Sequence, residues 1–336
     1  MADGIFVGRF IGEHALAAVN IIMPVALIIF ALSNMIAVGS SVKVATALGG
    51  GKTEKAKRLF SASVLMIVGL GFIFLILGLL FAKPIIHTII KDKILAEMAY
   101  SYVKVFIFGF PFVMPLFAMD NFLRVCGKAK YSMWINVIVS ILNIALDWLF
   151  IAKLGLGIEF SALSTIVSMI LGSFFSFAPF FTKKITLHFA KPQISISEAI
   201  GIVYNGASEF FSSVAGSFIA TVVNVFLLNL GGAIAVASYG IVMYIDTLLV
   251  GILYGVLDSV QPAVSYNLGA NEIKRTFSFF KISSISTAIL SLICMIVILL
   301  FPEMLASIFT KENNIEITEM TTAALLLFAP SYLFTW

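Results

Sequence analysis

Residues 61–82 read SASVLMIVGLGFIFLILGLLFA, an apolar run of twenty-two residues without a single charge. A helix of that length rises about 33 Å at 1.5 Å per residue, enough to cross the ~30 Å hydrocarbon core of a bilayer. Basic residues bound the run on both sides, at Arg58 and Lys83. The segment is therefore predicted to be a membrane-spanning helix.

The rest of the 336-residue chain follows the same pattern. Apolar residues make up 61% of it and charged residues 11%, against roughly 45–50% and about 25% in soluble domains. A surface with so few charges must face lipid. The runs are helix-length and contain Gly and Pro, so we expect an all-α polytopic membrane protein and not a β-barrel. Hydropathy predicts nine spans, at roughly 15–47, 58–82, 98–122, 132–152, 160–182, 199–230, 234–268, 277–301 and 317–336.

Basic residues gather in alternate loops. Thirteen of the 21 lysines and arginines lie near residues 52–58, 124–130, 183–191 and 274–281, so these loops are predicted to be cytoplasmic. The net charge of +4 then reflects topology and not a nucleic-acid partner. We expect a multi-pass protein of the cell inner (plasma) membrane. The first residues, MADGIFVGRFIG, resemble the end of a helix whose missing start would be cytoplasmic.

The sequence also matches itself at an offset of 220 residues. GEHALAAVNI from Gly12 aligns with GAIAVASYGI from Gly232, and LGGGKTEKAKRLF from Leu48 aligns with LGANEIKRTFSFF from Leu268. Both copies keep the basic loop on one side, so the repeats are parallel, as in one class of secondary transporters. We expect two helical bundles, 1–195 and 196–336. The complete protein would have six helices in each bundle, twelve in all, of which about ten are represented in a chain truncated at both ends.

Several kinds of chemistry are not supported by the sequence. Cys126 and Cys294 stand alone in apolar surroundings and the histidines are scattered, which predicts neither disulfides nor a metal site. GGGKT at Gly49 resembles a phosphate loop, but Thr46 replaces the glycine that such a loop requires. No nucleophile and base pair or cofactor motif is evident. We therefore predict no catalytic residue, no enzyme activity and no cofactor, and an ion gradient as the energy source.

Acidic residues inside predicted spans are the candidate functional groups, because a charge at a helix centre costs at least ~2.5–3.5 kcal/mol. Asp3 lies six residues before Arg9 and Asp147 six before Lys153, which places both acids about 9 Å inside the outer ends of their helices. Asn143 shares a helix face with Asp147. These oxygens suit Na⁺, and the carboxylates can instead carry a proton. The alternative is that both acids are ordinary residues near helix ends.

The second half of the chain has acids of its own. Glu209 and Asp246 are predicted to line a cavity and attract a cationic substrate, or to add a second proton site. Asp258 fits either cavity lining or a hydrogen bond between helices. In the first half, Pro24 lies in mid-helix and frees a backbone carbonyl, so it is a candidate hinge, with an ordinary structural kink as the alternative.

Five stretches in order resemble the signatures of the multidrug and toxic compound extrusion (MATE) transporters: DGIFVGRFIGEHALAAVNIIMP, VGSSVKVATALGGGKTEKAKR, DNFLRVCGKAK, LNIALDWLFIAKLGLG and SVQPAVSYNLGANEIKR. The resemblance implies antiport, in which entry of Na⁺ or H⁺ drives small organic cations or amphipathic drugs out of the cell. In this comparison Asp3 matches the acid of the first helix, Asn143 and Asp147 match the Asn and Asp of the fifth, and Thr165 matches a hydroxyl residue of the sixth. Together they would bind the coupling ion. The family's acid on the tenth helix is not evident within 317–336.

Two other functions remain open. Relatives in the same superfamily flip lipid-linked saccharides, and a chain that lacks helices could be an inactive fragment. For the efflux function we expect alternating access between the two bundles, contacts with membrane lipid, no nucleic-acid partner and a monomeric protein.

Overall fold

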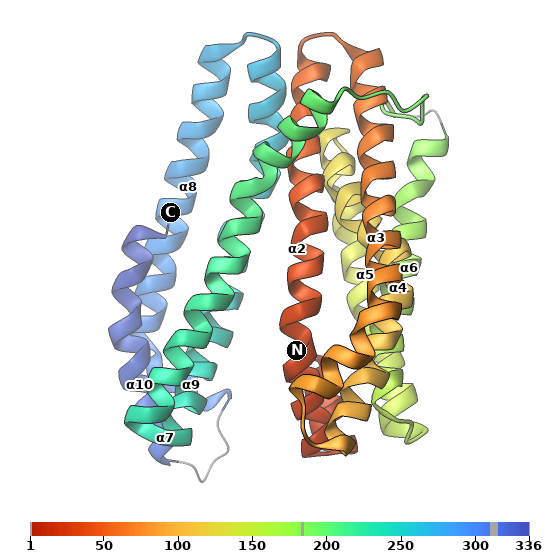
Figure 1. Cartoon of the computed structure of the whole chain (residues 1–336). Coiled ribbons are helices and arrows are strands. Elements are labelled where there is room, and N and C mark those ends of the chain that lie inside the picture. The colour runs from red at the N-terminus through yellow and green to blue at the C-terminus, as the bar shows by residue number, and fades with distance from the viewer. Residues whose placement is uncertain (1, 183–184, 310–314, 336) are drawn as a thin grey trace. The chain divides into compact units, whose positions relative to one another are not determined.

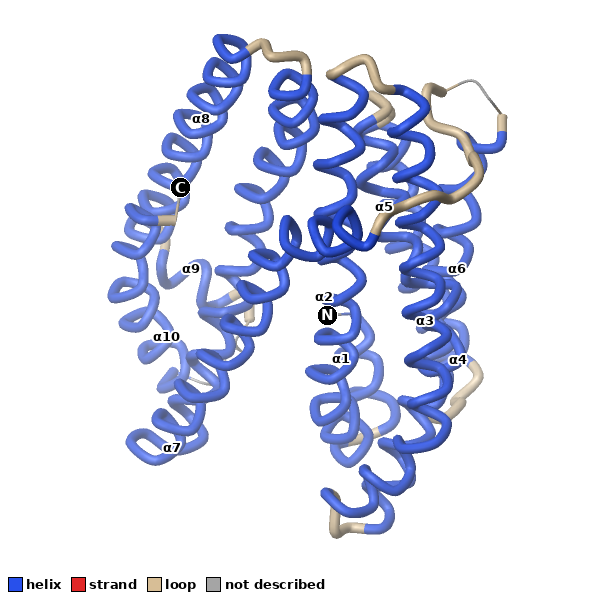
Figure 2. The backbone as a smooth tube through the Cα atoms, turned by 45° about the horizontal axis from the view of Figure 1, so that its top comes forward, coloured by secondary structure: helices blue, strands red, loops and turns tan. Residues whose placement is uncertain are grey.

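The computed structural model describes residues 2–182, 185–309 and 315–335, and within these ranges it contains helices and loops but no strand (Figures 1 and 2). Nine of the described helical segments are long and apolar enough to cross a membrane. The expected all-α polytopic membrane fold is confirmed. In chain order the elements are α1 (Ala2–Phe6), the π-helical η1 (Val7–Ile11), α2 (Glu13–Gly49), α3 (Thr53–Ile89), α4 (Lys93–Val125), α5 (Ala129–Asp147), the π-helical η2 (Trp148–Lys153), α6 (Ile158–Phe181), α7 (Ile196–Gly269), α8 (Ile273–Leu300), α9 (Pro302–Ser307), α10 (Ile315–Phe328) and the 3₁₀-helical η3 (Ala329–Phe334).

The chain divides into two compact units, Met1–Val214 and Ala215–Trp336. The division falls inside α7, whereas the bundle boundary expected from the sequence lies at 195/196. The first turns of α7 belong with unit 1 because they pack closely on α2. A Cβ added at Gly206 would lie only 1.8 Å from the carbonyl oxygen of Met35, so the two backbones are in direct contact there.

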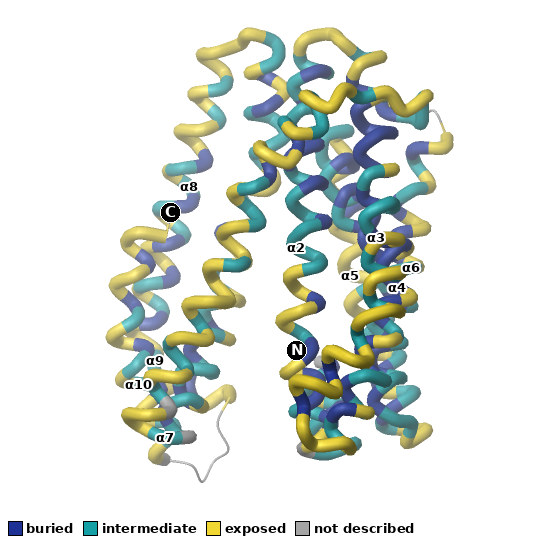
Figure 3. The backbone as a smooth tube through the Cα atoms, viewed as in Figure 1, coloured by how far each residue is buried: buried dark blue, intermediate teal, exposed yellow. Residues whose placement is uncertain are grey.

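Unit 1 is built around α4, the most buried of the nine spans. Its buried side chains pack against α2, α3 and α6, and Figure 3 shows how buried and exposed positions follow one another along each helix. Phe30 of α2 packs its ring against those of Phe106, Phe110 and Phe117, with centroids 5.6–6.3 Å apart. The Ser33 hydroxyl also donates to the Met114 carbonyl at 3.0 Å. Aromatic packing and interhelical hydrogen bonds replace the hydrophobic drive that is missing between helices in lipid.

Unit 2 has a smaller core, formed by the second span of α7 with α8, α9, α10 and η3. Buried residues from these elements include Val242, Cys294, Ala306, Leu325 and Tyr332.

The internal repeat is visible in the helix boundaries of the two units. Near Gly232 two helices meet end to end within α7, because this residue takes a non-helical conformation with φ 64° and ψ −159°. Gly12, at the equivalent position of the first copy, separates η1 from α2 and has φ 122°. Further equivalent boundaries, each pair 220 residues apart, are the helix ends Gly49 and Gly269, the left-handed turn residues Gly51 and Asn271, and the helix starts Thr53 and Ile273.

Candidate functional site

Three helices of unit 1 bring together the residues predicted to bind the coupling ion. Asp3 lies on α1, Asn143 and Asp147 on the last turns of α5, and Thr165 on α6. The Thr165 hydroxyl Oγ1 donates to Asp3 Oδ2 at 2.7 Å, and Asn143 Nδ2 donates to Thr165 Oγ1 at 3.2 Å. Asp3 is only 9% exposed. Asp3 is thereby joined in one continuous hydrogen-bonded group to residues 140 and 162 positions further along the chain.

Asp147 lies beside this group and is fully buried, with 0% exposure. Neither of its carboxylate oxygens accepts a hydrogen bond from a residue that the structure describes. Asp3, Ser164 and Tyr102 are polar side chains near it. An ionised carboxylate without a partner is costly to bury, so Asp147 requires either a cation or a proton. With Asp3 alongside, the site holds two carboxyl groups that a single cation could bridge.

Each acid precedes a π-helical turn. Helix α1 runs into η1, and Asp147 is the last residue of α5 before η2 begins at Trp148. The two π-helical segments contact each other, and their last turns carry Arg9 and Lys153. Single π-turns inside helices are frequent at functional sites because they redirect side chains locally. Nothing in the sequence of Trp148–Lys153 marks such a turn.

Two further hydroxyl groups, which were not predicted from the sequence, lie near the site. Tyr102 of α4 is fully buried and close enough to Asp3 and Asp147 to interact with them electrostatically, and its hydroxyl has no hydrogen-bond partner among the described residues. Ser161 lies one turn before Thr165 on α6, and its hydroxyl is also buried and unpartnered within the described part of the chain. Both are neutral oxygens that a hard cation accepts as ligands. Among the described residues, no three His, Cys, Asp or Glu side chains are grouped as a transition metal would require.

The three acids of the second half have separate surroundings. Glu209 belongs to unit 1, where Asn34 Nδ2 of α2 donates to its Oε1 at 3.4 Å. Asp246 belongs to unit 2 and accepts a 2.8 Å hydrogen bond from the hydroxyl of Tyr332 on η3. Asp258 lies on an exposed part of α7. A common substrate cavity for these acids stays a prediction. Pro24 lies inside α2, which continues as one helix from Glu13 to Gly49, and its role as a hinge also stays a prediction.

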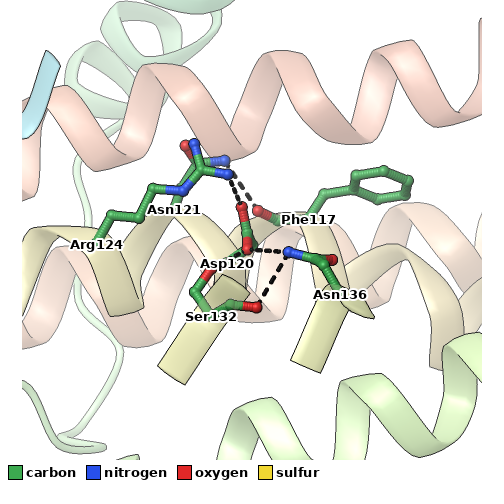
Figure 4. Close-up of polar contacts among 6 residues, drawn as sticks. All are labelled: Phe117, Asp120, Asn121, Arg124, Ser132 and Asn136. Atoms are coloured by element: carbon green, nitrogen blue, oxygen red, sulfur yellow. Dashed lines mark hydrogen bonds and ion pairs between the residues drawn. The ribbon is translucent and has the colours of Figure 1, made fainter. Parts of the chain in front are cut away.

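A second polar group joins α4 to α5 (Figure 4). Asp120 accepts hydrogen bonds from Arg124, with which it forms an ion pair, from Ser132, and from Asn136 Nδ2 at 2.8 Å. Asn121 Nδ2 donates to the Phe117 carbonyl at 2.9 Å. The group holds the end of α4 against the start of α5, close to Lys128 and Lys130.

The sequence and the fold are similar to those of known proteins. The family model described as MatE matches residues 1–149 and 209–336, most of the chain. The chain belongs to the MatE family. MATE proteins are transporters, so this chain is a multi-pass membrane transporter and not an enzyme.

Relatives agree with this assignment. The multidrug export protein MepA of Staphylococcus aureus is 28% identical over 341 residues, which cover 98% of this chain and 74% of the relative. MepA of Staphylococcus haemolyticus is 28% identical over 340 residues with the same coverage. This MATE chain thus spans about three-quarters of the length of these relatives.

Solved structures show the same fold. A crystal structure of MATE in complex with MaL6 has a TM-score of 0.92 and 25% identity, and the match covers 99% of this chain and 75% of that one. An outward-facing multidrug resistance MATE family transporter of the MOP superfamily has a TM-score of 0.89 and 24% identity, with 99% and 74% coverage. Within this MATE transporter, Asp3, Asn143 and Asp147 lie in the stretches matched by the family model, whereas Thr165 lies in the unmatched interval 150–208.

Proposed function

We propose that this MATE transporter exports small organic cations and other amphipathic drugs in exchange for Na⁺ or H⁺. The export of drugs is supported by the similarity to MepA along almost the whole chain. The coupling to a cation is supported by one observation above all: the carboxylate of Asp147 is fully buried beside Asp3 and accepts no hydrogen bond within the described part of the chain.

The coupling ion enters the group formed by α1, α5 and α6. Two carboxylates that are close together repel each other when both are charged, and either a Na⁺ ion or a proton relieves that repulsion. For Na⁺, ligands would come from the carboxylates of Asp3 and Asp147 and from the neutral oxygens of Asn143 and Thr165. For H⁺, one proton would be held on Asp147, next to Asp3.

Transport follows from alternating access, in which the ion and the drug favour different conformations. An ion can shift such an equilibrium only by as much as its affinity differs between the two states. The hydrogen-bonded chain Asn143–Thr165–Asp3 links α5, α6 and α1, so an ion bound there acts on the relative positions of three helices. The conformation that separates these helices would bind the ion more weakly and release it.

The acids outside this group are assigned to the substrate. Glu209 and Asp246 give the transporter negative charge at two further positions within its spans, which raises the local concentration of cationic drugs. In this proposal the protein lies in the plasma membrane with its basic loops in the cytoplasm and works as a monomer. Pro24 supplies a hinge in α2.

The direct test is ethidium efflux from sealed vesicles that contain the full chain and are given an imposed Na⁺ or H⁺ gradient. Asp147→Asn and Asp3→Asn remove one charge each from the ion group. Glu97→Gln is a matched control, because Glu97 is an exposed acid at the start of α4 that only pairs with Lys83 and His87 at the surface.

We expect the unmodified chain and Glu97→Gln to export dye under one of the two gradients, which identifies the driving ion. Both aspartate variants should lose gradient-driven export while still binding dye in equilibrium measurements. Export that is equally strong in Asp147→Asn would refute the ion site. If no gradient drives export but lipid-linked saccharide is flipped in the same vesicles, the efflux proposal fails and a flippase replaces it. The absence of both activities would refute transport by this chain.

A further inference from the structure

An apolar groove lies between α5 and α6 on unit 1. It has a volume of about 270 Å³, and its lining includes Tyr131, Trp134, Ile138 and Leu142 from α5 and Leu171 and Phe175 from α6. We call this the α5–α6 groove. At Gly172, which is also part of the lining, the two helices pack closely, since an added Cβ would lie 2.4 Å from Cγ2 of Val139.

The groove lies on the opposite side of α5 from the ion group. Asn136, Ser140, Asn143 and Asp147 are spaced by four, three and four residues, and therefore share one face of the helix. Ile138, in the groove, is displaced by about 200° from Asn136 at 3.6 residues per turn. The Trp134 side chain in the groove is 59% exposed. The groove is therefore open to the surroundings of the helix pair and is separate from the candidate ion site.

The length of the groove corresponds to one leaflet of a bilayer. Its lining residues on α5 run from Tyr131 to Leu142, a rise of about 17 Å along the helix. Half of the ~30 Å hydrocarbon core is about 15 Å. A single acyl chain lying along the groove would thus extend from the membrane interface to the midplane.

Two lysines precede Tyr131, the first residue of α5 that lines the groove. Lys128 and Lys130 are exposed at the start of α5, and neither forms an ion pair with any residue that the structure describes. The nearby acid Asp120 is already paired with Arg124. At the same end, the Tyr131 hydroxyl donates to the Phe175 carbonyl at 2.9 Å and ties α5 to α6. Tyrosine and tryptophan beside lysines are typical of the level of the lipid headgroups.

We propose that the α5–α6 groove is a binding site for one phospholipid with an anionic headgroup. The acyl chain lies in the groove against Trp134, Ile138 and Leu171, and the phosphate contacts Lys128 and Lys130. The lipid belongs to the leaflet next to the 124–130 loop. Two lysines beside one anionic headgroup are worth roughly 25-fold in relative affinity over a zwitterionic lipid, at about tenfold per 1.4 kcal/mol and ~1 kcal/mol per basic residue.

Fluorescence quenching of Trp134 by brominated lipid tests this proposal. The full chain with Trp148→Phe and Trp336→Phe, which leaves Trp134 as the one tryptophan of the sequence, is reconstituted in phosphatidylcholine vesicles. A minor fraction of the lipid is brominated on its chains and is either phosphatidylglycerol or phosphatidylcholine. We expect brominated phosphatidylglycerol to quench Trp134 at a concentration roughly 25-fold lower than brominated phosphatidylcholine.

Two sets of variants separate the contribution of the headgroup from that of the acyl chain. Lys128→Gln with Lys130→Gln should abolish the preference, Lys128→Arg with Lys130→Arg should keep it, and Lys91→Gln with Lys93→Gln is the control at another exposed lysine pair. Ile138→Phe fills the groove and should weaken quenching by both lipids, whereas Ile141→Phe adds the same bulk at a 62% exposed position outside the lining.

Three results would overturn the proposal. Equal quenching by the two brominated lipids would mean that the groove holds ordinary surrounding lipid. A preference that survives the double glutamine substitution would place headgroup recognition elsewhere. Displacement of brominated phosphatidylglycerol from Trp134 by low concentrations of ethidium, in a manner that Ile138→Phe prevents, would identify the groove as a drug site.

Discussion

At the scale of single residues, the candidate ion site depends on contacts between residues that are far apart in the sequence. Asp3, Asn143 and Asp147 could be selected from the sequence as candidate ion-site residues, because a charge within an apolar span needs a compensating partner. The contributions of Tyr102 and Ser161 could not, since Tyr102 lies on α4, far from the acids in the sequence, and Ser161 is brought to the site only by the packing of α6 beside α5. The same holds for the hydrogen bond from Tyr332 to Asp246.

Thr165 provides the sharpest residue-level prediction. Thr165→Val keeps the shape of the side chain but removes the hydroxyl that donates to Asp3 and accepts from Asn143. A hydrogen bond to a charged group is worth about 1.5–3 kcal/mol, so the driving-ion concentration for half-maximal dye export should rise roughly 10- to 100-fold. Thr165→Ser retains the hydroxyl and should stay close to the unmodified protein. An unchanged ion dependence in Thr165→Val would remove Thr165 from the site.

Cys126 offers a pH-dependent test at the loop that follows α4. Burial raises the pKa of its thiol to about 11, although a backbone hydrogen bond at Leu187 and the charge of Lys128 act in the opposite direction. The reactive thiolate is therefore scarce at neutral pH. With Cys294→Ser as background, the rate of maleimide labelling of the folded protein should rise about tenfold per pH unit until close to pH 11. A plateau below pH 9 would contradict this environment, and the unfolded chain provides the reference.

At the scale of helices, hydropathy located the membrane spans but not their ends. The run predicted at 58–82 belongs to a helix that extends over Thr53–Ile89, because turns outside the hydrocarbon are held by backbone hydrogen bonds and can carry charge. The π-helical turns η1 and η2 have no sequence signal, since they arise where α1 and α5 pack against each other. By contrast, the offset of 220 in the sequence corresponds closely to the observed helix boundaries.

The contact of α7 with α2 leads to a prediction about stability. Gly206→Ala would place a Cβ 1.8 Å from the Met35 carbonyl, a backbone atom that can move only if the helices separate. Overpacking of this kind costs about 1–3 kcal/mol, so the midpoint of thermal unfolding in detergent should fall. Gly216→Ala on the same helix is the control, because an added methyl there meets no atom within 4 Å. Equal midpoints for the two variants would show that α7 and α2 are loosely packed at Gly206.

At the scale of the whole molecule, the orientation in the membrane can be tested with single cysteines. In a background of Cys126→Ser and Cys294→Ser, Lys52→Cys replaces a residue of the basic loop between α2 and α3, and Lys91→Cys replaces one in the next loop. The positive-inside rule predicts that an impermeant maleimide added to intact cells labels Lys91→Cys and not Lys52→Cys. The reverse pattern would invert the proposed topology, and labelling of both after the cells are opened is the control for reactivity.

The repeated helix boundaries bear on how such a molecule came to divide its tasks. Asn271 adopts the left-handed conformation that Gly51 adopts in the first copy, so both copies have the same turn although only one has the residue that forms it most easily. The acid has no counterpart in the second copy, since Val223 stands where the first copy has Asp3. Because the helices are duplicated but the acid is not, ion preference can change through mutations in the first half of the chain. Substrate preference can change independently through mutations in the second half.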